Sequence, residues 1–395
     1  MGTSNQLIVR AGRVRAGDRW LQRHDVLVRD GRVAAIEPTG TLRPGAIEII
    51  DAAGLDVVPG FIDLHCHGAA GADFMDATAE AVETITARHA AGGTTAMLAT
   101  TAAHPPDRIL EAIQNTARAI EAGAGACEIL GIHLEGPYFA PHRHGCHLAE
   151  AVRLPDPAQW RHWLEPGRHV RHLTLAPELP GAEELIRSAA AAGVTVAAGH
   201  SEATYDEVMA AARWGLSHVT HIYSVMSSIV KRGPRRIAGL LEAVLLEDGL
   251  TTEIIADNHH VDPVLARLAY KCKGPDRMAL VTDAMRGVGM PDGVYAFGGL
   301  DGTEAIVEGG VAVNAARTGF ASSTATMADC VRNCCGIQGR PYEEALERAS
   351  RTPARIAGVQ ERKGTLAPGM DADIVLLGPG VEVRMTISRG RRNEQ

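Results

Sequence analysis

The sequence predicts an α/β protein, a (β/α)8 TIM barrel with a small β-sandwich domain built from the N- and C-terminal segments. Between residues 59 and 358, short apolar segments alternate with Ala-rich helical segments, whereas residues 1–58 and 359–395 contain only strand-like segments. Eight strand–helix units over about 230 residues are typical of a TIM barrel. With 46% apolar residues, the chain can fill a large core. We therefore expect the barrel to be inserted between the two halves of the small domain.

The first 58 residues show alternating apolar positions and turn signals such as Asp30-Gly31, with no helical periodicity. The strands expected there are Leu7–Val9, Asp25–Val28, Val33–Ile36, Ile47–Ile50 and Leu55–Val58. At the other end of the chain, Ile374–Leu377 and Val381–Ser388 have the same character. We expect these two segments to pair with the N-terminal strands.

Eight barrel strands are expected in the central region. They are Phe61–Gly68, Thr94–Thr101, Ile129–Glu135, Leu173–Glu178, Val194–Ser201, His218–Ser224, Thr252–His260 and Met278–Ala284. Helical patterns between them include Glu80–Ala91, Pro106–Ala122, Ala182–Ala192 and Tyr205–Trp214. After the eighth strand we expect an irregular stretch, Tyr295–Val313, and then helices over Ser323–Gly336 and Tyr342–Ser350.

Composition excludes several classes of partner and compartment. A net charge of −8 and an aromatic content of 4% argue against a nucleic-acid partner, and no apolar run is long enough to span a bilayer. The seven cysteines are odd in number and form no C-x-x-C pair, which favours reduced thiols and a cytoplasmic protein. Met1–Asn5 shows no basic-then-apolar signal.

Polar residues collect where the barrel strands are expected to end, which is where TIM barrels place their sites. His65 and His67 alternate with Cys66 along the first strand, so the two imidazoles face the same way and the thiol points into the barrel wall. Seven such groups would share one rim: His65, His67, Glu135, His200, His221, His260 and Asp283. One buried ionisable group is often a paired structural residue, but seven together favour nitrogen and oxygen ligation of Zn²⁺ or a similar ion.

Longer motifs make the pattern more specific. They are Pro59-Gly60-Phe61-Ile62-Asp63, His133-Leu134-Glu135-Gly136-Pro137, Leu175-Ala176-Pro177-Glu178, Gly199-His200-Ser201, Thr220-His221, His260-Val261-Asp262-Pro263, Val281-Thr282-Asp283-Ala284-Met285 and Gly289-Met290-Pro291-Asp292-Gly293. Through these motifs the sequence resembles the amidohydrolase superfamily and, within it, the N-acetylglucosamine-6-phosphate deacetylases, over nearly the whole chain.

The resemblance implies a divalent metal, with Zn²⁺ favoured and one or two ions per subunit. Glu135, His200 and His221 match the ligands of the metal common to these deacetylases. His65 and His67 match second-metal ligands that some members lack, and Glu135 would then bridge the two ions.

The resemblance also implies roles around the substrate. Asp283 matches the catalytic aspartate, and His147 matches a histidine that contacts the amide carbonyl. His260 matches a sugar-contacting histidine and Arg232 a phosphate-binding arginine. The implied reaction removes the acetyl group from an amino sugar 6-phosphate, with N-acetylglucosamine 6-phosphate giving glucosamine 6-phosphate and acetate. The family is commonly dimeric, so a homodimer is expected.

These residue types suit amide hydrolysis. A metal lowers the pKa of bound water toward about 7, which makes a nucleophile available at neutral pH. Asp283 would take the proton from that water and pass it to the leaving amine, while His147 would help stabilise the oxyanion.

Two substrate-facing segments depart from the family pattern. After His221 the family reads Leu-Tyr/Phe-Asn-Ala-Met, where this chain has Ser224 and Val225 in place of the phosphate-binding asparagine and alanine. The family's Leu-Ala-Gly-Ser is Phe320–Ser323 here. N-acetylgalactosamine 6-phosphate, another N-acyl amino sugar or an N-acyl amino acid therefore remain open as substrates. A scaffold without catalysis is disfavoured, because every metal position and the aspartate are filled.

The basic run Lys231–Arg236 could bind phosphate, but its sequence alone favours an exposed, solvated loop. The resemblance implies phosphate binding only for Arg232 and leaves Arg235 and Arg236 open. His142, His144 and His147, beside Arg143, could suggest a separate metal site. We instead interpret this loop as a mobile lid whose histidines meet water, and we assign a role only to His147.

Overall fold

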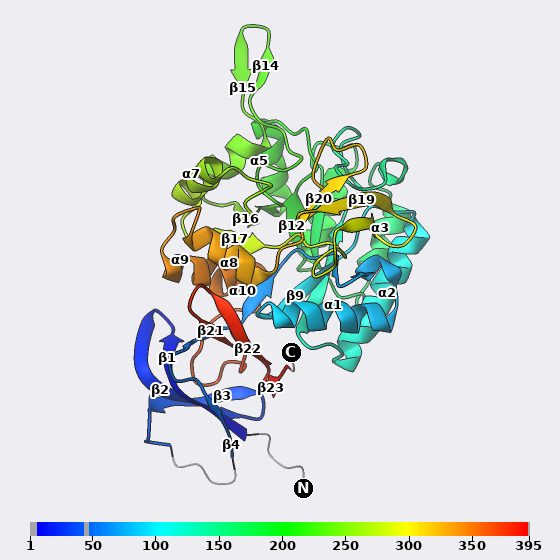
Figure 1. Cartoon of the computed structure of the whole chain (residues 1–395). Coiled ribbons are helices and arrows are strands. Elements are labelled where there is room, and N and C mark those ends of the chain that lie inside the picture. Colours follow the sequence, from blue (N-terminus) through cyan, green and yellow to red (C-terminus); the bar gives the residue numbers. More distant parts are fainter. Residues whose placement is uncertain (1–5, 43–46, 394–395) are drawn as a thin grey trace.

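A computed structural model of the chain describes residues 6–42 and 47–393, and it confirms the predicted fold class. Figure 1 shows the barrel with the small β domain against one end of it. Within the described residues, eight parallel strands form the barrel sheet in the order β17-β16-β13-β12-β11-β10-β9-β6. In chain order they are β6 Phe61–Asp63, β9 Thr94–Thr100, β10 Glu128–Glu135, β11 Val170–Leu175, β12 Thr195–Ala198, β13 Leu216–Val219, β16 Thr251–Ile255 and β17 Met278–Val281.

Hydrogen bonds between the first and last strands close the barrel. The Asp283 amide donates to the His65 carbonyl at 2.9 Å, and the Thr282 hydroxyl donates to the Asp63 carboxylate at 2.6 Å. These bonds lie beside His65 and Asp283, so the closure of the barrel also positions site residues.

Helices cover the outside of the barrel between successive strands (Figure 1). They are α1 Ala79–Ala91, α2 Pro106–Ala122, α3 Pro157–Trp163, α4 Ala182–Ala191, α5 Tyr205–Trp214, α6 Leu240–Leu246, α7 Pro263–Lys273, α8 Met327–Cys335, α9 Tyr342–Ala349 and α10 Arg351–Ile356. Local signals in the sequence set the bounds of these helices. Helix α2 begins at Pro106, because the first turn of a helix does not use the N–H group that proline lacks. It ends before Gly123, which adopts a left-handed conformation with φ +63°. None of the described helices is both long and apolar enough to cross a membrane.

The two chain ends share one curled sheet with its own core. Its order is β23-β22-β21-β5-β1-β2-β3, with β4 beside β1. The strands are β1 Gln6–Ala16, β2 Arg19–Arg29, β3 Arg32–Pro38, β4 Glu48–Asp51, β5 Asp56–Pro59, β21 Ile374–Gly378, β22 Glu382–Ser388 and β23 Arg391–Arg392. The C-terminal β21 pairs antiparallel with β5, as expected for a domain built from both ends. Met1–Asn5, on which the expectation of no signal segment rests, lies outside the described residues.

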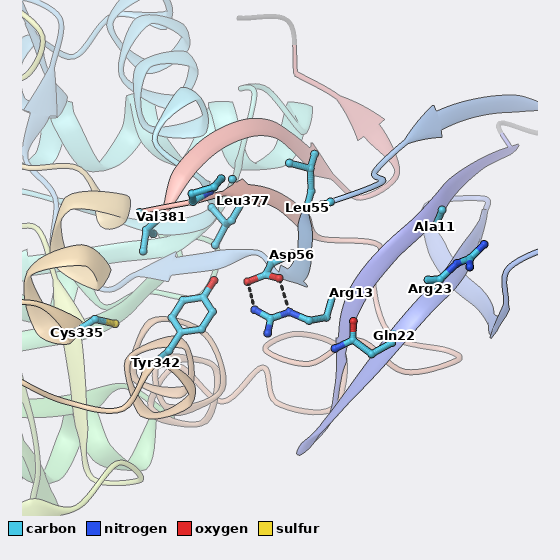
Figure 2. A pocket seen from close by; sticks show the side chains of 14 residues that line it. Ala11, Arg13, Gln22, Arg23, Leu55, Asp56, Cys335, Tyr342, Leu377 and Val381 are labelled. Carbon is cyan, nitrogen blue, oxygen red and sulfur yellow. Dashed lines mark hydrogen bonds and ion pairs between the residues drawn. The ribbon is translucent and has the colours of Figure 1, made fainter.

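A cleft of about 610 Å³ lies where the small domain meets the barrel helices (Figure 2). Arg13 of β1 donates from Nε and Nη2 to both oxygens of Asp56, each at 2.6 Å. The Trp20 ring stacks on Tyr342 of α9 with centroids 5.9 Å apart. Because Arg13 is paired with Asp56 and the cleft is lined by residues of both domains, we assign it to the packing of the two domains.

The prediction that Tyr295–Val313 is irregular was wrong. This region forms a three-stranded antiparallel sheet of β18 Gly293–Phe297, β19 Thr303–Glu308 and β20 Val311–Asn314. Gly309 and Gly310, with φ of +57° and +76°, make the tight turn between β19 and β20. A Gly-Gly pair between two short apolar runs is a hairpin signal that the sequence does contain.

Several predicted strands were too long at their C-terminal ends. The first ends at Asp63 rather than Gly68, the sixth at Val219 rather than Ser224, and the seventh at Ile255 rather than His260. The backbone turns away just beyond the sheet: His200, His221 and Asp283 have φ of +52°, +29° and +46°. Non-glycine residues in this conformation are uncommon and cluster at functional sites. Helix α8 likewise begins at Met327 rather than Ser323, after the Thr326 cap.

Candidate metal centre and active site

Five predicted ligands meet at the C-terminal mouth of the barrel, all of them buried. Glu135 is the last residue of β10, and its two oxygens face different histidines. Oε2 lies 3.4 Å from Nε2 of His65 and 3.2 Å from Nε2 of His67. Oε1 lies 3.3 Å from Nε2 of both His200 and His221. The side chains therefore form two groups that share one carboxylate.

The geometry of these groups fits metal ions. None of the contacts to Glu135 has hydrogen-bond geometry, so among the described residues neither buried oxygen of Glu135 has a donor. Imidazole nitrogens also face each other, at 3.3 Å for His65 and His67 and 3.1 Å for His200 and His221. Tetrahedral ligands about 2.0–2.1 Å from an ion lie about 3.3 Å apart. The donor set thus fits one divalent ion in each group.

A second buried group near the barrel wall does not have this character. Asp63, Cys66 and His89 are close enough to hold an ion. Asp63, however, already accepts from the amides of His65 and Thr282 and from the Thr282 hydroxyl. The Cys66 thiol points away from the two site histidines, as expected, and contacts Nε2 of His89 at 3.1 Å. Both oxygens of the Asp63 carboxylate are therefore already satisfied by donors of this chain.

Asp283 follows β17 and stands beside the His65–His67 group. Its Oδ1 lies 3.5 Å from Nε2 of His65 and 3.4 Å from Nε2 of His67, and it accepts from the Ser322 hydroxyl at 3.1 Å. Burial raises the pKa of this carboxyl, but the positive charge of His65 and the hydrogen bond from His67 outweigh burial and hold the pKa at about 2. Asp283 is therefore an ionised acceptor at neutral pH.

His147 reaches the site from the loop after β10 with a defined tautomer. The Ala103 amide donates to its Nδ1 at 3.1 Å, so in the neutral ring the proton sits on Nε2. Burial lowers the pKa of His147 and favours the neutral form. Its Nε2–H lies 3.3 Å from Oε2 of Glu135 and can donate to an oxygen bound in the mouth.

A cavity of about 480 Å³ opens over these residues. Ser224, Val225 and His260 line it, as do Phe320 and Ser322 from the second departing segment. Val225 has φ +48°, a strained conformation for a β-branched residue. His260 donates from Nδ1 to Asp257 at 2.7 Å, which fixes its ring against Phe320 at a centroid distance of 4.5 Å.

Arg232 does not reach the cavity of its own chain. It lies in the exposed hairpin of β14 Val230–Arg232 and β15 Arg235–Ile237, which projects from the barrel in Figure 1. Basic side chains do line the cavity, from the loop that we interpreted as solvated: His142, Arg143 and His144. Arg143 is paired with Glu202 at 2.6 Å, and its carbonyl accepts from Nδ1 of His200 at 2.6 Å.

Sequence reasoning missed Asn314 and Thr318, which also line the cavity. They lie at the end of β20 and just after it, directly beyond the stretch wrongly predicted to be irregular. The Gly309-Gly310 turn is the signal that could have placed them.

Comparison with known proteins identifies the family. Residues 57–392 match the model described as "Amidohydrolase family". The chain is 36% identical to an N-acetylgalactosamine-6-phosphate deacetylase of Escherichia coli O157:H7, over 97% of this chain and 98% of that protein. It is 35% identical to an N-acetylglucosamine-6-phosphate deacetylase of Bacillus subtilis, over 92% of this chain and 91% of that protein.

A solved structure agrees with these relatives. An Asp-to-Ala mutant of the N-acetylglucosamine-6-phosphate deacetylase of Mycobacterium smegmatis, in complex with N-acetylglucosamine 6-phosphate, superposes with a TM-score of 0.89 at 33% identity, covering 100% of both chains. With its barrel, its Glu135-centred mouth and this likeness over its whole length, the chain belongs to the amidohydrolase family and, within it, to the N-acetylglucosamine-6-phosphate deacetylases.

Proposed function

We propose that this protein hydrolyses the N-acetyl group of N-acetylglucosamine 6-phosphate to give glucosamine 6-phosphate and acetate. The observation that carries the proposal is the shared carboxylate of Glu135 between two histidine pairs, with Asp283 beside one pair. The cavity above them leaves room for a sugar phosphate. Relatives named for this activity, at 33–36% identity over most of the chain, support it.

Each residue would have a defined task in this reaction. His65, His67, Glu135, His200 and His221 would hold divalent metal, which supplies an acidified water and polarises the amide carbonyl. Asp283 would accept the proton of the attacking water and deliver it to the departing nitrogen. His147 would donate from Nε2 to the developing oxyanion.

We propose Zn²⁺ as the metal, with two ions per chain. Each group offers two imidazoles and the shared carboxylate, a donor set that suits zinc, and the 3.1–3.4 Å spacing in both groups fits tetrahedral ligation. Elemental analysis of protein dialysed against zinc-buffered solution should give two ions per chain.

The phosphate end of the substrate would lie toward Ser224, Val225 and His260. For Arg232 to bind that phosphate, its hairpin must reach the cavity of another chain, because it projects away from its own. We therefore propose a homodimer in which Arg232 serves the partner's cavity. The exposed apolar side chains of Ile229 and Val230 at the hairpin, and of Val264 and Leu268 on α7, support a surface that a second copy covers.

Complementation between inactive variants tests this arrangement. Arg232→Ala subunits and Asp283→Asn subunits should each be impaired alone. Mixed dimers of the two should regain activity, since one cavity then has an intact Asp283 and the partner's intact Arg232. No recovery in verified mixed dimers would remove the shared site, and sedimentation as a monomer would remove the dimer.

N-acetylgalactosamine 6-phosphate is the second candidate substrate. The Escherichia coli relative named for it covers slightly more of this chain than the Bacillus subtilis relative. In addition, Ser224 and Val225 replace the asparagine and alanine of the N-acetylglucosamine-6-phosphate deacetylase pattern.

A cytoplasmic location is proposed as well, and the seven free cysteines support it.

The deciding experiment measures amine release by the zinc-loaded protein. N-acetylglucosamine 6-phosphate, its galacto epimer and unphosphorylated N-acetylglucosamine would be compared by kcat/KM. Fast turnover of the gluco phosphate ester alone supports the proposal, and preference for the galacto ester supports the second candidate. No turnover of any of them by protein with two bound ions would contradict both.

A further inference from the structure

A carboxylate beneath the metal centre has no role in the function proposed above. Glu253 lies in the middle of β16 and is fully buried, with 0% of its surface exposed. Its Oε1 lies 2.7 Å from Nδ1 of His65 and accepts from the His221 amide at 3.3 Å. Its Oε2 lies 3.4 Å from Nε2 of His218. Glu253 thus touches one residue from each of the two ligand groups.

The contact with His65 determines how that imidazole is presented. An imidazole that ligates a metal ion is neutral and carries one proton, and a carboxylate beside Nδ1 holds that proton there. Nε2 of His65, which faces Glu135 and Asp283, is then left with its lone pair directed into the mouth. A carboxylate behind a ligating histidine also raises its basicity and fixes its ring.

The other site histidines are held differently. Nδ1 of His200 donates to a backbone carbonyl, and Nδ1 of His67 and His221 has no partner among the described residues. Among the four histidines of the two ligand groups, within the described residues, His65 is therefore the one whose Nδ1 faces a charged side chain. Burying a carboxylate is costly, so a well-aligned contact at 2.7 Å between two fully buried groups points to a use beyond filling space.

We propose that Glu253 is a positioning residue that orients His65 and so sets the affinity of the ion position formed by His65 and His67. It acts through His65 and touches no substrate atom. The inference rests on the proposed function only in requiring that metal binds at these residues.

The test is the metal affinity of Glu253→Gln, measured by dialysis against buffered Zn²⁺ with elemental counting. Glutamine keeps the volume but removes the charge, and its amide can donate to Nδ1 and move the proton to Nε2. One ion should bind about 10–100-fold more weakly, the usual cost of losing an outer-shell carboxylate, while the other is unchanged. Glu128→Gln is the matched control, because Glu128 is a hydrogen-bonded carboxylate at the opposite end of the barrel, and it should leave both affinities unchanged.

A double-mutant cycle separates positioning from general damage. In a His65→Ala background, Glu253→Gln should change the affinity of the remaining ion less than about 2-fold, because its target is gone. If Glu253→Gln weakened zinc binding as much in the His65→Ala background as in wild type, Glu253 would act on the whole barrel. That result would overturn the proposal. Should Glu253→Gln not fold, Glu253→Asp gives the same readout, since the shorter side chain withdraws from Nδ1 of His65.

The remaining outcomes distinguish failure of this inference from failure of the proposed function. Two ions bound with unchanged affinity in Glu253→Gln would overturn the positioning role while the deacetylase proposal stands. The positioning role would also be overturned if wild-type protein bound a single ion and the His65→Ala variant still bound it. The deacetylase proposal would stand in that case too. Wild-type protein that binds no divalent ion would instead contradict the proposed function itself.

Discussion

Two clusters of charged residues lie at opposite ends of the barrel, one buried at the mouth and one partly buried at the base, and only the base cluster is neutralised by side chains of the described residues. At the base, Arg362 donates to both Glu128 and Asp371, and Lys363 lies 2.8 Å from Glu128 and 3.2 Å from Asp371. Lys363 also pairs with Asp373. Every carboxylate of this base cluster therefore faces a fixed cation.

At the mouth, Glu135 faces imidazoles alone. Within the part of the chain that the structure describes, its oxygens have no hydrogen-bond donor, and the nitrogens around it face one another in pairs. Such an arrangement is unfavourable without a cation between the groups. The comparison teaches that a buried charged cluster stabilises the fold when it is complete, as at the base. When it is incomplete, as at the mouth, it indicates a bound ion.

The largest expected effect, on both metal binding and turnover, comes from replacing Glu135, the carboxylate that the two histidine pairs share. Glu135→Gln removes the charge that both ligand groups use, so both ions should be lost or bound far more weakly. Since losing an outer-shell partner already costs about 10–100-fold in metal affinity, losing the common ligand should cost more and reduce turnover to background. Elemental analysis and amine release measure the two effects. Retention of both ions would contradict the bridging role.

Asp283→Asn should leave the metal in place while removing the proton carrier. Turnover should fall about 10²–10⁴-fold, the usual contribution of a general acid–base group, with two ions still counted per chain. The paired readout distinguishes this variant from Glu135→Gln. Unchanged turnover, or loss of metal along with activity, would contradict a role in proton transfer.

His147→Gln tests the donor that stands beside the proposed metal ligands. Its loss should lower kcat about 10²–10³-fold with little change in KM, as for other oxyanion donors. His142→Gln is the matched control, because His142 comes from the same loop and lines the same cavity without contacting Glu135. That control should stay within about 3-fold of wild type, and equal losses in the two variants would remove the special role of His147.

Much of the mouth could be predicted from sequence, because strand ends in a barrel converge whatever lies between them. His65, His67, Glu135, His200, His221 and Asp283 each follow an apolar strand, so their convergence needed only the order of the strands. Two features could not be predicted. Glu253 lies within a strand, and its contact with His65 depends on the inward layers of side chains. Arg232 matched a family position, yet the direction of its hairpin is a property of the fold.

The base cluster was missed for a related reason. Glu128 and Arg362 lie 234 residues apart in the chain, and each resembles an ordinary surface charge in sequence. Only the pairing of the C-terminal segment with the small domain and the barrel base brings them together. Long-range ion pairs carry no local pattern, unlike the Gly309-Gly310 turn, whose signal was present and was misinterpreted.

The smallest expected effect sharpens the comparison at the base. Burial raises the pKa of Glu128, but hydrogen bonds from Arg362 and the charge of Lys363 outweigh burial and lower the pKa from 4.5 to about 2. Because the folded pKa lies below the unfolded value, the stabilisation is complete above pH 4.5 and is lost as pH falls toward 2. Glu128→Gln should therefore lower the free energy of unfolding by up to about 3 kcal/mol at pH 7. The gap between the variant and wild type should fall to about half by pH 3.

Thermal midpoints of both proteins from pH 7 to pH 3, at fixed zinc, measure this gap. The zinc sites titrate in both proteins, so their contribution cancels in the difference. A gap that stays constant down to pH 3 would show that Glu128 contributes packing rather than charge. Metal content should be the same in both proteins at pH 7. The charges of the base cluster are paired with one another, at the end of the barrel opposite the proposed metal site.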